Sequence, residues 1–410
     1  MKKKPMHAPM DQFPVINGEL HIGGIAISRL AERVGQTPFY AYDRSLITKR
    51  VQYLRDSLPK EIHIHYAIKA NPMPAVVQHL AGLVDGLDIA SAGEMKTALD
   101  TIVPANKVSM AGPGKTDNEL RQAIAAGITI NLESENEMRR ADRIGEALGL
   151  TPRVAVRVNP DFDLKSSGMK MGGGPRQFGV DAERVPAMLK ELNTLGLAFI
   201  GFHIFWGSQN LNPKSIIGAH EKTFDLAIRL GEHAPGNVQS LNIGGGLGIP
   251  YFPGERRLDL TPIGENLVRL LSVLKANLPG VEIVTELGRY LVGEAGVYVC
   301  KVIDIKESRG ETFLVTDGGL HHHLAASGNF GQVIRKNFPV TISNNMAKND
   351  SKIVSIVGPL CTPLDLLANK MNLPEANAGD LAVIFQSGAY GLSASPDNFL
   401  GHKPAIEILV

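Results

Sequence analysis

Lys69 is the residue best placed to do chemistry, because it ends a short apolar segment, 62–68, just before the turn signal Asn71-Pro72. A lysine is seldom buried without a partner, so two interpretations compete here. In the first, the side chain extends from a strand edge to solvent. In the second, it is a desolvated amine that forms a Schiff base with a carbonyl cofactor. The residues that the rest of the chain brings close to Lys69 decide between them.

Apolar, β-branched segments alternate with helical stretches from residue 62 onward, which predicts eight strands: 62–68, 86–90, 108–111, 128–132, 153–158, 198–205, 239–243 and 282–285. Eight such units in succession favour a (β/α)8 TIM barrel, with an open doubly wound sheet as the alternative. Functional residues of a barrel lie at the carboxyl ends of its strands, where Lys69 stands. Ser91, Thr116 and Ser134 each precede a glutamate by three residues and predict capping boxes, which explains Glu94 and Glu137 without a catalytic role.

After about residue 290 the pattern changes to short strands broken by Gly, Pro and Asn, which indicates an all-β domain. The predicted fold class is therefore α/β, a TIM barrel plus a C-terminal β domain. We expect a disordered arm at 1–12, a segment at 13–44 that joins the β domain, the barrel at 45–290 and the β domain at 291–410.

The composition is that of an ordinary globular protein, with a net charge of +1 and 20% charged residues, and gives no reason to expect nucleic acid as a partner. No apolar segment approaches the length of a membrane span, and no apolar region follows the basic start as it would in a signal peptide. Two cysteines cannot make a disulfide framework. We therefore expect a cytoplasmic protein with no membrane partner.

Residues able to do chemistry also end the other predicted strands: Asp88, Gly112, Arg157, His203 with Phe205, Gly244-Gly245-Gly246, and Glu286 with Arg289. The glycine run follows the seventh strand, where barrels often bind phosphate through backbone N–H groups. Glu286 could keep a heteroaromatic nitrogen protonated. His203 and Phe205 lie two apart on one strand and could stack against a flat ring. Together with a Schiff-base lysine, these groups predict pyridoxal 5'-phosphate as the cofactor.

A series of motifs extends this prediction to most of the chain: Tyr66-Ala67-x-Lys69-Ala70-Asn71, Gly207-Ser208-Gln209, Gly244-Gly245-Gly246, Glu286-x-Gly288-Arg289, Gly358-Pro359-x-Cys361 and Gly388-Ala389-Tyr390. In type and order they resemble those of the fold-type III pyridoxal-phosphate decarboxylases, the diaminopimelate and ornithine decarboxylase group. The resemblance implies the alanine racemase-like architecture of a barrel with a β domain.

The resemblance also implies roles for single residues. Lys69 would hold the cofactor as a Schiff base, and Glu286 would bind the pyridine nitrogen. Asp88 and Arg157 would lie near the Schiff base and the ring. The phosphate would be surrounded by Ser208, Gly245, Gly246, Gly288, Arg289 and Tyr390. Phe205 stands where the family usually has a stacking histidine, so either Phe205 or His203 would cover the ring.

The enzyme would further be a homodimer with shared active sites. Cys361 of the second subunit would return a proton to the substrate carbanion after carbon dioxide leaves, and Asp365 would also come from that subunit. Arg289, Thr362 and Asp365 are the candidate substrate-binding residues.

Departures from the family pattern concern the substrate. Thr362 follows Cys361, where family members that accept a free distal amine have an acidic residue. The arginine-and-tyrosine segment for a distal carboxylate is also missing, and 321–327 stands in its place. An unmatched buried charge would cost several kcal/mol, which disfavours a substrate with both distal charges.

The segments 170–179, 361–363 and 387–393 resemble a sub-branch that contains the butirosin-pathway L-glutamyl-[acyl-carrier protein] decarboxylase and the exosortase A-associated decarboxylases. There the substrate can be an aminoacyl thioester on a phosphopantetheine arm. The loop 161–177 would be either a mobile lid or a contact of Lys165, Lys170 and Arg176 with an acidic carrier protein. The run 321–323 of three histidines predicts no metal site, because no carboxylate or cysteine stands at ligand spacing and neighbours on a strand point to opposite faces.

We therefore predict a pyridoxal-phosphate-dependent carboxy-lyase that acts on an L- or D-configured amino acid, either as a small molecule or bound to an acyl-carrier protein as a glutamyl-type substrate. Three alternatives remain. Diaminopimelate decarboxylase would act on free meso-diaminopimelate. A fold-type III racemase would pair the ring nitrogen with an arginine rather than with Glu286. A catalytically inactive regulatory homologue is disfavoured by the retention of Lys69 and Cys361.

Overall fold

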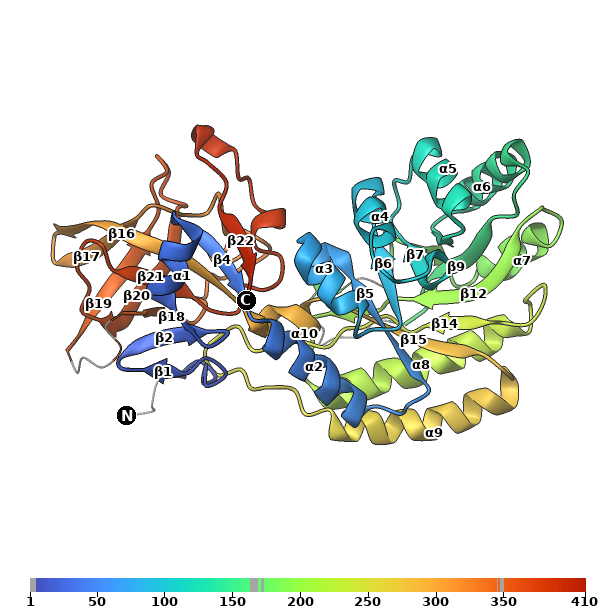
Figure 1. Ribbon diagram of the computed structural model, residues 1–410. Coiled ribbons are helices and arrows are strands. Elements are labelled where there is room, and N and C mark those ends of the chain that lie inside the picture. Colours follow the sequence, from blue (N-terminus) through green and yellow to red (C-terminus); the bar gives the residue numbers. More distant parts are fainter. Residues whose placement is uncertain (1–4, 163–168, 171–172, 345, 347–349) are drawn as a thin grey trace. The chain divides into compact units, whose positions relative to one another are not determined.

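The computed structural model describes residues 5–162, 169–170, 173–344, 346 and 350–410. The chain divides into two compact units. The barrel unit comprises Arg50–Gly248 and Leu258–Tyr290, and the β unit comprises Met1–Lys49, Ile249–Arg257 and Leu291–Val410 (Figure 1). In the described part of the chain, no helix is both long enough and apolar enough to cross a membrane.

The described part of the barrel unit is built on eight parallel strands in a closed ring (Figure 1). In ring order they are β5 (Ile62–Ala67), β6 (Gly86–Ile89), β7 (Val108–Met110), β8 (Thr129–Leu132), β9 (Arg153–Asn159), β12 (Ala198–Ile204), β14 (Ser240–Asn242) and β15 (Glu282–Leu287). β15 pairs with β5 and closes the ring, with Glu286 opposite His65. The prediction of a TIM barrel is confirmed, and the open sheet is excluded.

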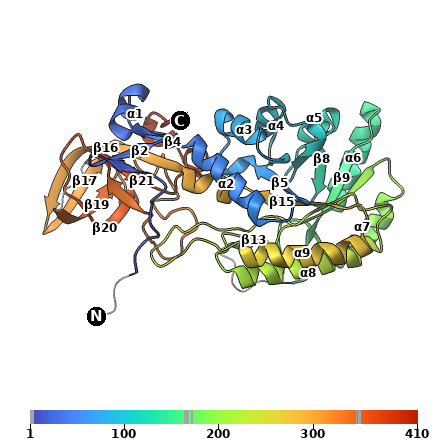
Figure 2. The ribbon, with the colours of Figure 1, turned by 60° about the horizontal axis from the view of Figure 1, so that its bottom comes forward.

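Helices alternate with these strands: α2 (Arg44–Ser57), α3 (Pro74–Ala81), α4 (Ala92–Leu99), α5 (Asp117–Ala126), α6 (Glu135–Leu148), α7 (Val185–Leu192), α8 (Pro213–Gly231) and α9 (Thr261–Asn277). They surround the ring of strands, and α8 and α9 lie side by side (Figure 2). Amphipathic helices of this kind bury their apolar sides on the barrel. The strand ends that carry the candidate residues are therefore held on a rigid frame.

The helix caps correct one prediction. The side chains of Ser91, Thr116 and Ser134 each accept a hydrogen bond from the backbone N–H three residues later, as expected. Only Thr116 completes a capping box, because Glu119 accepts from its backbone N–H in return. Glu94 accepts instead from the N–H of Ala90, and Glu137 forms an ion pair with Lys115. Capping therefore does not account for the carboxylates of Glu94 and Glu137.

The β unit contains a larger mixed sheet around the long strand β16 (Gly296–Ser308), which pairs with β4 (Phe39–Tyr42), β17 (Glu311–Thr316) and β21 (Leu381–Ile384). The sheet also includes β18 (Val340–Ile342), β19 (Ser351–Val357), β20 (Leu366–Pro374) and β22 (Ile406–Leu409). β22 runs parallel to β4, so the two ends of the chain share one sheet. β20 was not predicted, because Asn369 and Lys370 interrupt its apolar pattern.

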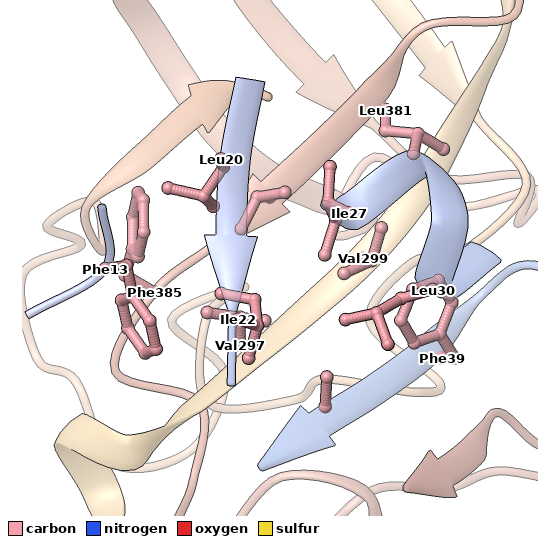
Figure 3. Packing of buried hydrophobic residues seen from close by; sticks show 12 residues of the cluster. Phe13, Leu20, Ile22, Ile27, Leu30, Phe39, Val297, Val299, Leu381 and Phe385 are labelled. Atoms are coloured by element: carbon pink, nitrogen blue, oxygen red, sulfur yellow. The ribbon is translucent and has the colours of Figure 1, made fainter. Parts of the chain in front are cut away.

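Residues near the start of the chain supply part of the core of the β unit. Leu20 of β2 (Glu19–Ile22) and Leu30 of α1 (Ile27–Val34) pack with Val297 and Val299 of β16 (Figure 3). β2 follows β1 (Val15–Ile16) in a hairpin and continues to β3 (Ile25–Ala26). Of the arm predicted to be disordered, residues 1–4 lie outside the described residues, whereas Asp11 forms an ion pair with Arg257.

Candidate active site

The centre of the candidate site is an ion pair between neighbouring strands. Lys69 lies in the 3-10 turn η1 (Ile68–Ala70) that directly follows β5, and its Nζ is 3.2 Å from Oε1 of Glu286 on β15. The hydroxyl of Tyr66 donates to the carbonyl of Asn71 at 2.8 Å and ties the turn to the strand. The Lys69 side chain is 47% exposed, so the expectation of a desolvated amine is wrong. The structure instead shows an accessible amine held by a buried counter-ion.

Glu286 is held as an anion by its surroundings. Burial alone would raise the pKa of this carboxyl, but the charge of Lys69, the contact with His203 and the charge of Arg157 outweigh burial and keep the pKa well below its usual range. Nε2 of His203 is 3.1 Å from Oε2 of Glu286, and both side chains are buried. Each carboxylate oxygen therefore faces a different basic group.

Two rings flank this pair. His203 lies on β12, and Phe205 directly follows that strand, with ring centroids 6.4 Å apart at 70°. The Phe205 ring centroid lies 6.0 Å from the Lys69 amine. Phe205 is partly exposed whereas His203 is buried against Glu286. Of the two candidates for stacking, Phe205 therefore offers the more accessible ring.

The glycine run after β14 forms a tight backbone cradle. Gly244 and Gly246 have φ angles of +68° and +85°, which side-chain-bearing residues rarely adopt. A Cβ on Gly245 would run into the carbonyl oxygen of Glu286, and one on Gly246 would run into the Trp206 ring. Among the interactions of the described residues, the N–H groups of Gly245 and Gly246 donate no hydrogen bond. These two donors are available for an anion.

The other predicted phosphate contacts of the barrel unit lie on segments that adjoin this cradle. Asn210 donates its N–H to the carbonyl of Gly246 at 2.9 Å, which holds β13 (Gly207–Ser208) beside the glycine run. Gly288 packs so closely on Ala70 that a Cβ there would lie 2.8 Å from the Ala70 Cβ. Arg289, the first residue of α10 (Arg289–Val292), therefore follows a turn packed on η1.

Asp88 and Arg157 occupy the interior of the barrel but differ in their partners. Asp88 is buried, accepts a hydrogen bond from the Ser109 hydroxyl and has Nδ1 of His65 3.7 Å from Oδ2. Arg157 donates to Glu133 at 2.7 Å. Glu133 was missed by the sequence analysis, although it ends a predicted strand as the other candidates do. Its position one residue before the cap Ser134 indicated only the start of a helix.

Cys361 and Asp365, which were predicted to come from the second subunit, lie in the β unit of the chain. Cys361 is an exposed free thiol in the turn after β19. Asp365 is 3% exposed, and its two oxygens accept hydrogen bonds from the N–H groups of Leu320 and Leu360. Burial raises the pKa of this carboxyl. The prediction that Asp365 binds substrate conflicts with this geometry, because one oxygen binds the turn that carries Cys361 and the other binds the distant segment at Leu320.

Tyr390 and the histidines at 321–323 also lie in the β unit. Tyr390 adopts a φ angle of +52°, and its ring stacks on Phe330 with centroids 6.4 Å apart. His321 and His322 lie in a turn and not on a strand, and their rings are 3.7 Å apart. The argument from opposite strand faces is therefore wrong, although within the described residues no group of three or more His, Cys, Asp or Glu could hold a metal ion. Lys165 and the side chain of Lys170 lie outside the described residues, and Arg176 is exposed.

Comparisons with known proteins find similarity over most of the chain. Residues 44–293 match the family model described as pyridoxal-dependent decarboxylase, pyridoxal binding domain. The chain is 38% identical to the L-glutamyl-[BtrI acyl-carrier protein] decarboxylase of Niallia circulans over 393 residues, which are 93% of this chain and 90% of that protein. It is 32% identical to the diaminopimelate decarboxylase of Aquifex aeolicus over 96% of this chain and 91% of the relative.

A solved structure shares the architecture. The crystal structure of diaminopimelate decarboxylase from M. jannaschii in complex with L-lysine matches with a TM-score of 0.87 and 27% identity, over 97% of this chain and 92% of that one. The similarity therefore extends through both units and is not confined to the barrel.

Proposed function

The chain belongs to the pyridoxal-dependent decarboxylase family, and from this premise we propose that it decarboxylates an aminoacyl group, of glutamyl type, carried as a thioester on an acyl-carrier protein. Pyridoxal 5'-phosphate is the cofactor of the family. The residues of the barrel unit fit it, since they combine an accessible lysine, a buried anionic carboxylate and a glycine cradle that a Cβ would fill.

Each residue has a task in this proposal. Lys69 binds the cofactor covalently, and the N–H groups of Gly245 and Gly246 bind its phosphate. Glu286 keeps a proton on the ring nitrogen, because its own pKa is too low for it to take that proton. When bound, pyridoxal 5'-phosphate supplies a ring that accepts the electron pair left behind as carbon dioxide departs. Phe205 offers an apolar ring beside the lysine amine, and His203 holds the second oxygen of Glu286.

The reaction also needs a proton donor for the α-carbon, and we assign this task to Cys361. Its thiol is exposed on a turn in which Asp365 binds the N–H of Leu360 and ties the turn to the N–H of Leu320. As in the family pattern, the thiol would serve the active site of a second copy in a homodimer. Sγ of Cys361 would give its proton to the substrate's α-carbon, and solvent would then reprotonate the thiolate.

Residues of the turn around Cys361 determine which substrate the enzyme accepts. Thr362 is uncharged, and its hydroxyl accepts a hydrogen bond from the N–H of Leu364 at 3.3 Å. Asp365, the one acidic residue between 358 and 366, is buried with both oxygens bonded to backbone. No described carboxylate of this turn is therefore open to a distal ammonium group, which supports a substrate without one. The 38% identity to a glutamyl-carrier decarboxylase supports the same choice.

The test is carbon dioxide release from a panel of substrates by the holoenzyme. We expect turnover of L-glutamyl-carrier thioester, and rates at least about 100-fold lower with free L-glutamate and free meso-diaminopimelate. Thr362→Asp should weaken the reaction of the thioester, whereas Thr362→Val, its match in size, should change it by only a few-fold. Preferred release from free diaminopimelate would contradict the carrier-bound substrate, and racemisation without carbon dioxide would contradict the decarboxylase.

A further inference from the structure

Glu133 is a buried carboxylate that binds three segments beside the candidate site. Its side chain is 2% exposed. Oε1 accepts hydrogen bonds from Nη1 of Arg157 and from the N–H of Gly112, both at 2.7 Å, and Oε2 accepts from the N–H of Gly179 at 2.8 Å. Burial raises the pKa of Glu133, but the charges of Arg157 and Lys115 and the hydrogen bonds more than offset it, so the pKa lies below its usual range. Glu133 is therefore a fixed negative charge.

Arg157 is the link from this junction to the site. It lies on β9 directly opposite His203 of β12 in the barrel sheet, and His203 contacts Glu286. The guanidinium also lies over the Phe178 ring, 4.9 Å from its centroid. Because arginine has a long and flexible side chain, the partner that fixes its charged end decides where the charge acts. That partner is Glu133.

We propose that Glu133 is a positioning residue of the active site: it holds the guanidinium of Arg157, which stands opposite His203 in the barrel sheet, and limits the positive field that Arg157 exerts on Glu286. This inference rests on the proposed function, in which Glu286 faces the ring nitrogen. Glu133 itself touches neither Lys69 nor Glu286 among the described contacts, so its effect has to pass through Arg157.

The chain contains a matched control for this role. Glu137, four residues later, is also buried, with its side chain 4% exposed, and its partner is Lys115 at 2.6 Å. Among the described contacts it makes no hydrogen bond to Arg157. If buried carboxylates in this region served folding alone, the loss of either charge would have the same consequences.

The test is titration of the apoprotein with pyridoxal 5'-phosphate, followed at the absorbance band at about 420 nm that is expected of the lysine-bound cofactor. We expect Glu133→Gln to weaken binding by about tenfold. We also expect the pH midpoint of the band to fall by about one unit. The charge of Arg157 is then less neutralised and disfavours a positive charge on the nitrogen that links Lys69 to the cofactor. Glu137→Gln should lower the melting temperature, yet leave binding within about twofold and the midpoint unchanged.

A double variant keeps the proposal testable if Glu133→Gln does not fold. Removing both partners, in Arg157→Met with Glu133→Gln, leaves neither charge of this pair buried without its partner. If Glu133 acts through Arg157, the double variant binds the cofactor as Arg157→Met alone does. Wild-type-like binding and midpoint in Glu133→Gln, equal effects of Glu133→Gln and Glu137→Gln, or a double variant much weaker than Arg157→Met would each overturn the proposal. A wild-type protein without the band would instead contradict the proposed function.

Discussion

Two lysines of the barrel unit, Lys69 and Lys115, each form an ion pair with a glutamate. The Lys115 side chain is 1% exposed, and its ammonium donates to Glu137 at 2.6 Å and to the carbonyls of Gly112 and Asn131. These three contacts use all the donors of the ammonium group. The Lys69 side chain is 47% exposed and lies 3.2 Å from its glutamate, in a turn after the strand.

The difference shows what separates a reactive lysine from a structural one in the same barrel. Both amines have an anionic partner, so pairing alone does not distinguish them. Lys115 is enclosed by acceptors from three segments and joins them, as expected of a group whose loss destabilises the fold. Lys69 is open to an incoming carbonyl, and the glycine cradle after β14 belongs to the same end of the barrel.

The largest effect is expected from Lys69→Ala. Because this variant removes the group that binds the cofactor covalently, decarboxylation should fall by about 10⁴-fold or more, and the band at about 420 nm should vanish. The melting temperature of the apoprotein should fall by less than in Lys115→Met, because buried Glu286 keeps its contact with His203 after Lys69 is removed. Carbon dioxide release and thermal unfolding check the two halves of this prediction. A stable variant that retains the band would end the assignment of Lys69.

The opposite pattern is expected from Lys115→Met. This change leaves Glu137 buried without its partner and should lower the free energy of unfolding by about 3–5 kcal/mol, measured by urea unfolding. The fraction that stays folded should still bind the cofactor with the wild-type band. Lys115→Met combined with Glu137→Gln is the control and should recover part of the lost stability. Loss of the band from folded Lys115→Met would erase the contrast between the two lysines.

Glu286→Gln tests the role of the carboxylate that pairs with Lys69. The amide cannot keep a proton on the ring nitrogen, so kcat should fall by about 100-fold, while the cofactor remains bound to Lys69. Single-turnover kinetics with the cofactor band as a control would separate the two effects. An unchanged kcat would show that the charge of Glu286 plays no part in the reaction.

The smallest effect concerns a buried base without an ionic partner among the described residues. Burial lowers the pKa of His220 from its ordinary value of 6.5 to about 4. Between these two pKa values the folded state binds fewer protons than the unfolded state. The contribution of neutral His220 to the free energy of unfolding is therefore fully present above pH 6.5 and is lost as the pH falls towards 4. The loss should not exceed about 1.4 kcal/mol per pH unit, and His220→Phe should reduce it.

Trp206 offers the measurement for this prediction. It is the only tryptophan of the chain, and its ring centroid lies 6.2 Å from that of His220. Urea unfolding followed by tryptophan fluorescence at several pH values therefore reports the barrel unit directly. Equal pH dependence in the wild type and in His220→Phe would show that another group is responsible.

The barrel and the main site residues could be predicted because they depend on local pattern. Eight apolar segments predict the strands, and the carboxyl ends of barrel strands lie close together. The sequence therefore predicts that the strand-end residues Lys69, Arg157, His203 and Glu286 share one site. The exposure of the Lys69 side chain could not be predicted, because it depends on where the turn η1 lies against neighbouring segments.

Other features depend on contacts between segments far apart in the chain. Glu137 pairs with Lys115, 22 residues away, and Asp365 binds the N–H of Leu320, 45 residues away. A spacing of three residues favoured a capping box for Glu137 and said nothing of Lys115. Asp365 looked like a free carboxylate for the same reason. The strand β20 was missed because Asn369 and Lys370 interrupt its apolar pattern, whereas pairing with β19 forms the strand.

The most direct test of the account is to identify the lysine that carries the cofactor. The holoenzyme would be reduced with borohydride, digested and examined by mass spectrometry for a pyridoxyl-modified peptide. We predict a single modified residue, Lys69, and an unmodified Lys115. Modification of Lys115 or of any other lysine in place of Lys69, or of none, would contradict the central claim.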